Sequence, residues 1–211
     1  MAHGLFVDGV WHSQWYDTSA TGGRFVPTEP IFRNWVTPDG SPGPSGEGGF
    51  AAEAGRYHLY VSLSCPWAHR TVIFRKLKGL ENIVSMSTVS PDMLKDGWTF
   101  NKDEGSSGDD VNGKSKLSEI YLLTDPRYTG RVSVPVFWDK KRKTIVNNES
   151  PEIIRMLNSA FDAFTNIHTD YYPKDLRSEI DRINDLVYPN INNGVYRAGF
   201  ATCLLYTSRC V

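Results

Sequence analysis

The residue best placed for covalent chemistry is Cys65, in the segment Ser64-Cys65-Pro66-Trp67-Ala68-His69-Arg70. An alternating segment rich in β-formers precedes it and a pattern of helical spacing follows it, so its sulfur is expected where a strand ends and a helix begins. Free backbone N–H groups and the positive end of the helix dipole lie there and favour the thiolate, which is the nucleophilic form. We therefore predict that Cys65 is a catalytic nucleophile; an inert buried thiol is the alternative.

The neighbours of Cys65 limit the chemistry that it can perform. Position 68, where a C-x-x-C redox motif would place its second cysteine, is Ala68. A site with one cysteine cannot form its own disulfide and must use a thiol from solution to resolve a mixed disulfide. Cys65 and His69 have the spacing of a pair of metal ligands, but the sequence offers no second pair, so we expect no metal site.

Two further segments could complete a binding site. Val134-Pro135 opens an expected strand, and this proline is a candidate for a cis peptide bond that leaves the preceding backbone free to pair with an extended peptide; a trans edge-strand proline is the alternative. Glu149-Ser150 begins an expected helix, where backbone N–H groups can take a carboxylate and the glutamate an ammonium group, although a plain helix cap would look the same. Together with Cys65, these segments describe a cradle for a γ-glutamyl tripeptide, which is the glutathione site.

The pattern along the chain places these residues on a thioredoxin-like α/β domain. A strand–helix–strand unit, which implies parallel strands and a right-handed crossover, precedes a β-hairpin and a helix. The predicted elements are strands over 56–63, 83–89, 132–139 and 144–147, a helix over 67–79, a helix from Ser150 and a helical segment from about Leu176. Tyr57, Leu59, Val61 and Leu63 are expected to share one face of the first strand. Residues 1–55 are expected to form an irregular arm, and 90–118 an inserted loop.

Composition excludes several classes of protein. The 211 residues include 23 Lys and Arg against 24 Asp and Glu, and this balance gives no support for a nucleic-acid or polybasic membrane partner. No apolar run approaches the roughly 18 residues of a membrane span, and the N-terminus lacks the features of a signal peptide. Three cysteines are too few for a disulfide scaffold and favour a reducing compartment. We therefore expect a cytoplasmic protein.

The segment around Cys65 resembles the signature of a known family. Residues 57–70, 130–136, 148–150 and 190–196 are similar to motifs of the glutathionyl-hydroquinone reductases, also called xi-class glutathione transferases. The resemblance extends over residues 4–202. It implies a thioredoxin-like domain with a long N-terminal arm, followed by an all-helical C-terminal domain, and it also implies a homodimer.

The resemblance also implies roles for individual residues. Cys65 would be the nucleophile and Tyr196 the acid/base residue, while Glu149 and Ser150 would hold the γ-glutamyl end of glutathione. The remaining residues expected to contact glutathione are Trp98, Arg131, Val132, Ser133 and Val134. Without the resemblance, Trp98 is a loop aromatic that covers a core, Arg131 a solvent-facing turn residue and Tyr196 a packed helical tyrosine.

The implied reaction reduces glutathionyl-hydroquinones to hydroquinones through a Cys65–glutathione mixed disulfide, which a second glutathione resolves. Three alternatives stay open. An omega-like glutathione transferase, acting as a thioltransferase or dehydroascorbate reductase, shares the mixed-disulfide step. A non-catalytic glutathione- or ligand-binding module need not form an adduct of about 305 Da on Cys65 with oxidised glutathione. A chain that does not fold is a third alternative.

The resemblance divides the chain into an arm (1–55), a thioredoxin-like glutathione-binding domain (56–165) and the start of a helical domain (175–202). Residues 203–211 depart from the family pattern, so we expect a truncated or frame-altered tail in which Cys203 and Cys210 are no redox pair. The family would continue through most of a helical domain. Because a fragment would expose an apolar face, we expect weak or no turnover from this chain.

Overall fold

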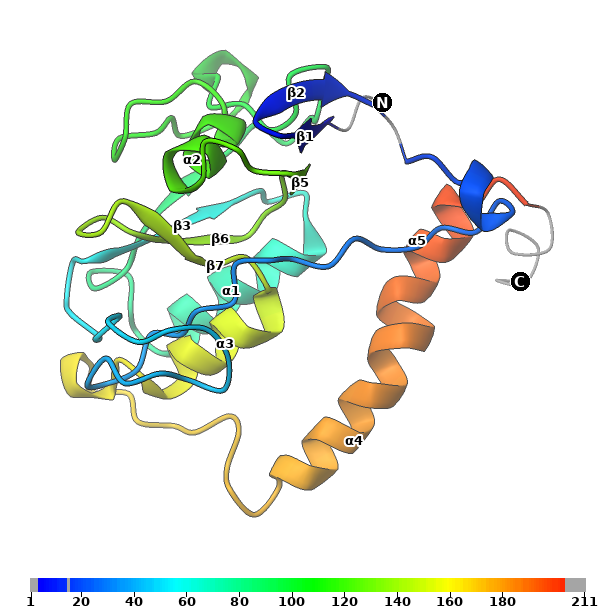
Figure 1. The fold of residues 1–211 in the computed structure, drawn as a ribbon. Coiled ribbons are helices and arrows are strands. Elements are labelled where there is room, and N and C mark those ends of the chain that lie inside the picture. The colour runs from blue at the N-terminus through cyan, green and yellow to red at the C-terminus, as the bar shows by residue number, and fades with distance from the viewer. Residues whose placement is uncertain (1–3, 15, 204–211) are drawn as a thin grey trace. The chain divides into compact units, whose positions relative to one another are not determined.

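The computed structural model describes residues 4–14 and 16–203, and these form two compact units. The first unit contains residues 4–14 and 30–170, and the second contains residues 16–29 and 171–203. The predicted N-terminal arm is therefore divided between them. Its residues 16–29 belong with the helices of the second unit, whereas residues 4–14 and 30–55 belong with the sheets of the first (Figure 1).

A four-stranded mixed sheet with strand order β4-β3-β6-β7 forms the centre of the first unit. Strands β3 and β4 are parallel, whereas β3 pairs with β6, and β6 with β7, in antiparallel fashion. The bounds are β3 Tyr57–Val61, β4 Ser85–Thr88, β6 Val136–Asp139 and β7 Thr144–Asn147. These strands confirm the predicted order of a parallel β-α-β unit followed by a hairpin.

Helix α1 (Pro66–Leu77) makes the crossover from β3 to β4, and α3 (Ser150–Ser159) follows β7. Both helices begin with proline in their first turn, where a missing N–H leaves no bond unmade. Gly79, with a φ of 63°, ends the first of them in the left-handed conformation that a side chain disfavours. The two helices pack against each other on one face of the sheet, and α2 (Leu117–Thr124) lies on the other face (Figure 1).

Strand β3 is buried along its whole length, because helices cover both faces of the sheet. Tyr57, Leu59 and Val61, which were expected to share one face, are buried, and so are His58 and Tyr60 on the other face. Leu63, expected on the same face as Tyr57, lies beyond the end of the strand and is 62% exposed.

Residues 4–13 form a β-hairpin rather than an irregular segment. Strands β1 (Gly4–Val7) and β2 (Val10–Ser13) pair with each other, and β5 (Gly130–Arg131) adds to β1 as the third strand of a small sheet. Asp8 and Gly9 form the turn with φ angles of 48° and 77°. An Asp-Gly pair between short apolar strands is a known hairpin signal, so the sequence did contain the information.

Polar contacts hold the expected inserted loop, which leads into α2, a helix that the sequence did not predict. Before α2, the loop contains one short 3-10 helix, Lys102–Glu104. The buried carboxylate of Asp109 accepts hydrogen bonds from the Tyr60 hydroxyl and from the backbone N–H groups of Val111, Asn112 and Lys114. These bonds fix the loop against the central strand.

A buried ion pair fastens the chain before β3 to the end of β6. The Arg56 guanidinium donates from Nε and Nη2 to the Asp139 carboxylate, which is fully buried. The same guanidinium also donates to the carbonyl groups of Gly49 and Ala51. The pair therefore closes residues 49–56 onto the sheet; its desolvation makes it more important for position than for net stability.

The second unit consists mainly of consecutive helical segments: α4 (Arg177–Val187), a π-helical segment (Tyr188–Asn192) and α5 (Asn193–Phe200). A short 3-10 helix, Ser19–Thr21, lies in the same unit. An aromatic cluster joins Tyr16 and Phe25 to Tyr196 and Phe200. Several apolar side chains of these helices are exposed, among them Ile183, Leu186, Ile191 and Val195.

Over the described residues, none of the helices combines the length and apolar character needed to cross a membrane.

His58 is a buried base in the middle of β3. Its Nδ1 lies 2.8 Å from the Ser85 hydroxyl, and its Nε2 has no hydrogen-bond partner among the described residues. Burial, with a smaller effect of Lys140, lowers the pKa of His58 to about 4. The folded protein therefore holds this imidazole neutral.

This burial predicts an acid-sensitive fold. The folded pKa of His58 lies below the unfolded value of 6.5, so the unfolded state binds more protons between those pH values and stability falls as pH falls from 6.5 toward 4. We expect the free energy of unfolding, from urea titrations, to fall by up to about 1.4 kcal/mol per pH unit in this window. His58→Gln should flatten the slope, while His168→Gln, at an exposed position, should keep it. An unchanged slope in His58→Gln would contradict the assignment.

Candidate active site

The register of the central sheet brings together the four loops at one end of its strands, which is called the loop edge below. In the parallel pair, Val61 at the end of β3 lies opposite Thr88 at the end of β4. In the antiparallel pairs, Tyr60 lies opposite Val136 and Asn147 opposite Phe137. The segments after β3, before β6 and after β7 therefore meet at this edge. They carry Cys65, Val134-Pro135 and Glu149-Ser150, which are the segments that the sequence predicted to form one site.

Cys65 is the N-cap residue of α1, with extended backbone angles. Its carbonyl accepts the first helical hydrogen bond, from His69 N at 2.9 Å, and its own N–H donates to the Ser62 carbonyl at 3.2 Å. The hydroxyl of Ser64 donates to the Pro91 carbonyl, which ties the turn before the cysteine to the loop after β4. The sulfur is therefore held at a strand-to-helix junction, as predicted.

Burial raises the pKa of the Cys65 thiol. The N–H groups of Ala68 and Trp67 and the charge of Arg70 act in the opposite direction, but burial is the larger effect. The thiol also donates to the Val134 carbonyl with an S···O distance of 3.7 Å, a bond that only the protonated form can make. In this structure burial outweighs the helix entrance, so the pKa of the thiol is raised rather than lowered, contrary to the prediction of a favoured thiolate.

The Val134–Pro135 peptide bond is cis, the isomer that the sequence left undecided. Val134 itself is buried, and its carbonyl faces the Cys65 sulfur. Its N–H group has no hydrogen-bond partner among the described residues. A backbone donor is thus left unpaired beside the thiol, in the position where the sequence predicted a peptide ligand.

Ser150 lies in the first turn of α3 and is linked to α1 by Arg70. The Ser150 hydroxyl accepts from Arg70 Nε at 2.9 Å and from Nη2 at 2.6 Å, so its own proton stays available to another acceptor. The same guanidinium lies over the Trp67 ring, 4.9 Å from its centroid. Arg70 therefore connects the helix that carries the thiol to the helix that carries the expected carboxylate site.

Glu149 is the N-cap of α3 and is partly exposed. Its N–H donates to the Asn147 side-chain oxygen at 2.8 Å, and its carbonyl accepts the first N–H groups of the helix. This backbone geometry is that of an ordinary cap. The side chain is placed beside Ser150, so the structure also leaves the predicted ligand role open.

Residues 131–134 run from the small sheet to the cis proline. Tyr121, which is fully buried, accepts from the Ser133 N–H and donates to the Ser133 carbonyl. The Tyr128 hydroxyl donates to the Arg131 carbonyl, and the Arg131 side chain donates to the Gln14 carbonyl at 3.4 Å. Val132 is buried. The segment is therefore rigidly held, while glutathione contacts of Arg131, Val132 and Ser133 stay predictions.

Two predicted site residues are not brought to the thiol by any contact described. Trp98 is 8% exposed and belongs to the apolar core of the first unit, and its carbonyl accepts from Leu117 N. Tyr196 lies on α5 of the second unit and stacks with Phe25 at a centroid distance of 6.4 Å. Trp98 therefore fits the interpretation as a loop aromatic that covers a core, and Tyr196 fits that of a packed helical tyrosine. The functional roles of both residues stay predictions.

Sequence reasoning missed Arg70 and Tyr121. Arg70 is five positions after Cys65 and three after Trp67, so its place on the same helix face could have been inferred from the spacing. Tyr121 had no such signal, because its helix was not predicted.

Within residues 4–14 and 16–203, no group of three or more His, Cys, Asp or Glu side chains could hold a metal ion.

The comparisons with known proteins agree with this geometry. The family model of the glutathione S-transferase N-terminal domain matches residues 64–160. Glutathionyl-hydroquinone reductase YqjG of Escherichia coli (strain K12) is 58% identical over 200 residues, covering 94% of this chain and 61% of that protein. Its glutathione-bound structure superposes with a TM-score of 0.86 at 52% identity, covering 98% of this chain and 61% of that one.

Other relatives extend the likeness. Glutathione S-transferase omega-like 2 of Schizosaccharomyces pombe is 46% identical over 190 residues, covering 88% of this chain and 58% of that protein. A xi-class glutathione transferase from Natrialba magadii has a TM-score of 0.84 at 43% identity, covering 99% of this chain and 61% of that one. Over almost its whole length, this chain is therefore similar to xi-class glutathione transferases. It spans about three fifths of the length of these relatives.

The state of the Cys65 thiol predicts how its reactivity depends on pH. Only the thiolate is alkylated, and a raised pKa keeps the thiol protonated at neutral pH, so reactivity should appear as pH rises and be lost as it falls. We expect the rate of alkylation of Cys65 by iodoacetamide, followed on its own peptide by mass spectrometry, to rise steadily up to at least pH 9.0. Arg70→Gln should move the rise to higher pH, because it removes a charge that favours the thiolate.

Arg127→Gln supplies the matched control, because Arg127 is exposed and paired with Asp8 instead. A rate that is already constant between pH 6 and pH 8 would show a thiolate at neutral pH and would contradict the burial argument.

Proposed function

We propose that this chain carries the glutathione-binding and thiol-transfer part of a glutathionyl-hydroquinone reductase. The observation that carries the proposal is the meeting, at one sheet edge, of a single cysteine with two groups suited to a γ-glutamyl peptide. These are the unpaired N–H of Val134 and the first turn of α3 with Ser150. The names of YqjG and of its glutathione-bound structure support it.

The binding part of the proposal assigns a role to each group. The backbone of Val134 would pair with the cysteinyl residue of glutathione, as an added strand pairs with a sheet edge. The first N–H groups of α3 and the Ser150 hydroxyl would take the γ-glutamyl carboxylate, and Glu149 its ammonium group. Trp98, Arg131, Val132 and Ser133 would contact the remainder. Glutathione acts here as a co-substrate.

The proposed reaction begins with attack of the Cys65 thiolate on the sulfur of the glutathionyl-hydroquinone. A disulfide bond forms between Cys65 and glutathione while the bond from sulfur to the aromatic carbon breaks. The electron pair of that bond stays on the ring carbon, which takes a proton, in our proposal from Tyr196, and the hydroquinone leaves. The thiolate of a second glutathione then attacks the mixed disulfide, releasing oxidised glutathione and the Cys65 thiolate.

Because burial raises the pKa of Cys65, the thiol must lose its proton before it can attack. Arg70 is the charged neighbour that favours the thiolate, and its bonds to Ser150 place it between the sulfur and the proposed γ-glutamyl site. The homodimer that the family resemblance implies, and a cytoplasmic location, remain predictions.

The nucleophile is tested by adduct formation, which does not depend on turnover. After incubation with oxidised glutathione, we expect the chain to gain about 305 Da on the peptide that contains Cys65, because thiol–disulfide exchange leaves glutathione attached. Cys65→Ser should abolish this adduct and any reductase activity, whereas Cys203→Ser should leave both unchanged. Adduct formation confined to other cysteines, or hydroquinone release by Cys65→Ser, would overturn the proposal.

A second candidate function is favoured by the omega-like name of the S. pombe relative. An omega-like enzyme would use the same mixed disulfide to reduce dehydroascorbate or small disulfides. The two are separated by comparing kcat/KM for a glutathionyl-hydroquinone and for dehydroascorbate in the same preparation. We expect at least a tenfold preference for the glutathionyl-hydroquinone, equivalent to about 1.4 kcal/mol of transition-state binding. A preference for dehydroascorbate would support the second candidate.

A further inference from the structure

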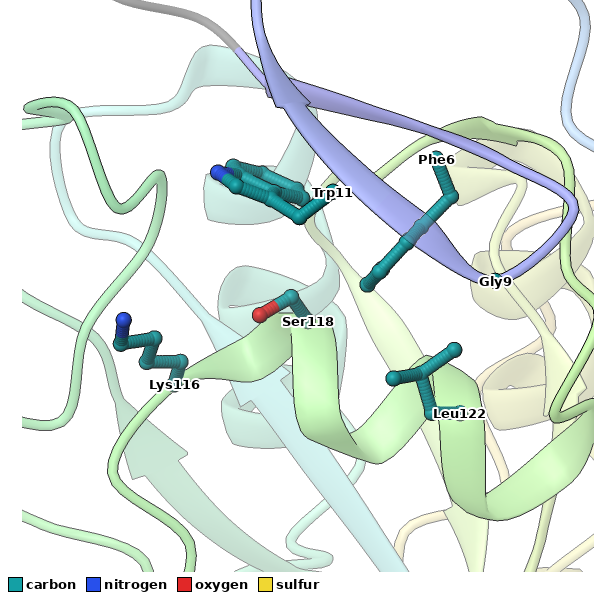
Figure 2. Close-up of a pocket in the computed structure, with 6 residues that line it drawn as sticks. All are labelled: Phe6, Gly9, Trp11, Lys116, Ser118 and Leu122. Atoms are coloured by element: carbon teal, nitrogen blue, oxygen red, sulfur yellow. The ribbon is translucent and has the colours of Figure 1, made fainter.

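A small pocket lies between the N-terminal hairpin and helix α2, on different elements from those that carry the thiol. Its volume is about 220 Å³, and it is lined by Phe6, Gly9, Trp11, Lys116, Ser118 and Leu122. All of these residues belong to the first unit. Figure 2 shows the rings of Phe6 and Trp11 on the hairpin side of the pocket, with Leu122 and Ser118 facing them from the helix.

The aromatic side chains that form the apolar wall of the pocket pack closely against each other and against neighbouring backbone. Phe6 and Trp11 meet edge to face with ring centroids 5.2 Å apart. The indole fits only because two glycines lie against it. A Cβ atom on Gly4 would lie 1.7 Å from a ring carbon of Trp11, and one on Gly97 would lie 2.9 Å away. The indole N–H donates to the Lys95 carbonyl at 3.4 Å. The backbone is thus adapted to keep an aromatic wall in this position.

One polar group inside the pocket has no partner. Ser118 is 7% exposed, and its hydroxyl makes no hydrogen bond to any described residue. Figure 2 shows this hydroxyl on the pocket side of α2, between the Trp11 indole and Lys116. The hydroxyl is not among the fully buried side-chain atoms that lack a partner, so it can be reached from the pocket and can donate or accept a hydrogen bond there. An oxygen of a bound molecule would satisfy it.

The charge at the rim is already neutralised. Lys116 Nζ is paired with the Asp96 carboxylate at 2.7 Å, so a ligand does not need to bring a negative charge. This favours a neutral hydroxyl over a carboxylate as the group that meets Ser118.

The volume sets the size of the occupant. A cavity of about 150 Å³ lined by apolar side chains holds benzene, so a space of about 220 Å³ suits one substituted ring. Sites for larger ligands begin at about 300 Å³, which excludes a tripeptide such as glutathione. We propose that this pocket is a binding site for a small monocyclic phenol, whose ring lies against Phe6, Trp11 and Leu122 and whose hydroxyl bonds Ser118.

The proposal is tested by binding, in the 211-residue chain that carries Cys65→Ser so that no thiol reaction contributes. We use 4-methylphenol as the probe and toluene as its matched analogue without the hydroxyl, and we follow the Ser118 amide and Leu122 methyl signals by NMR. Both signals should shift in a saturable way with 4-methylphenol. Ser118→Ala should weaken its binding about five- to tenfold, the usual worth of one hydrogen bond, and should leave toluene binding unchanged.

Two further variants complete the design. Leu122→Trp should fill the pocket and abolish binding of both probes, and Ser178→Ala, an exposed serine on α4, should change neither. Absence of saturable shifts at Ser118 and Leu122, an equal loss of both probes in Ser118→Ala, or tighter binding of benzoate than of 4-methylphenol would overturn the proposal. Because every measurement uses Cys65→Ser, failure here leaves the proposed reductase function untouched, and failure of that function leaves this site untouched.

Discussion

The pairing of β3 with its two neighbours is the constraint on which the rest of the structure depends. A parallel partner on one side and an antiparallel partner on the other bring the end of β3, the end of β4 and the start of β6 to the same edge. Because side chains and loops follow that register, a cysteine at position 65 and a valine at position 134 come within hydrogen-bonding distance across 69 positions of sequence. A slip of one residue in either pairing would turn these groups to opposite faces of the sheet.

At that edge, opposing electrostatic effects decide the state of the sulfur. The N–H groups of the first helical turn and the Arg70 guanidinium favour the thiolate, whereas burial and the Val134 carbonyl favour the thiol. Burial has the larger effect on the pKa of Cys65, so the thiol is favoured over the thiolate. A group that adds positive charge or hydrogen-bond donors beside the sulfur would shift this balance, because the opposing contributions are already in place.

Buried polar anchors determine how the loops around the site are held. Asp109 fixes the loop after β4, Tyr121 fixes the segment before the cis proline, and Arg56 with Asp139 closes the chain before β3. Each anchor joins residues distant in sequence, and each satisfies backbone groups that would otherwise be buried without partners. The hairpin β1–β2 and helix α2 both line the pocket that contains Ser118.

The sequence by itself determined the order of the central elements and the place of Cys65 between a strand and a helix. The β-rich segments 56–63 and 144–147, the proline after Cys65 and the serine–proline pair at 150–151 are local signals, and the structure confirms the elements that they predicted. The Asp8-Gly9 turn was an equally local signal that the aromatic, irregular character of its surroundings obscured.

Tertiary structure alone decided the quantities that depend on burial. The direction of the Cys65 pKa, the neutral state of His58, and the burial of both faces of β3 follow from how many atoms surround each group, which no window of sequence encodes. The link from Arg70 to Ser150 likewise spans 80 residues and exists only because α1 and α3 pack together. Spacing could identify a candidate nucleophile, but only the packed fold determines how strongly that cysteine holds its proton.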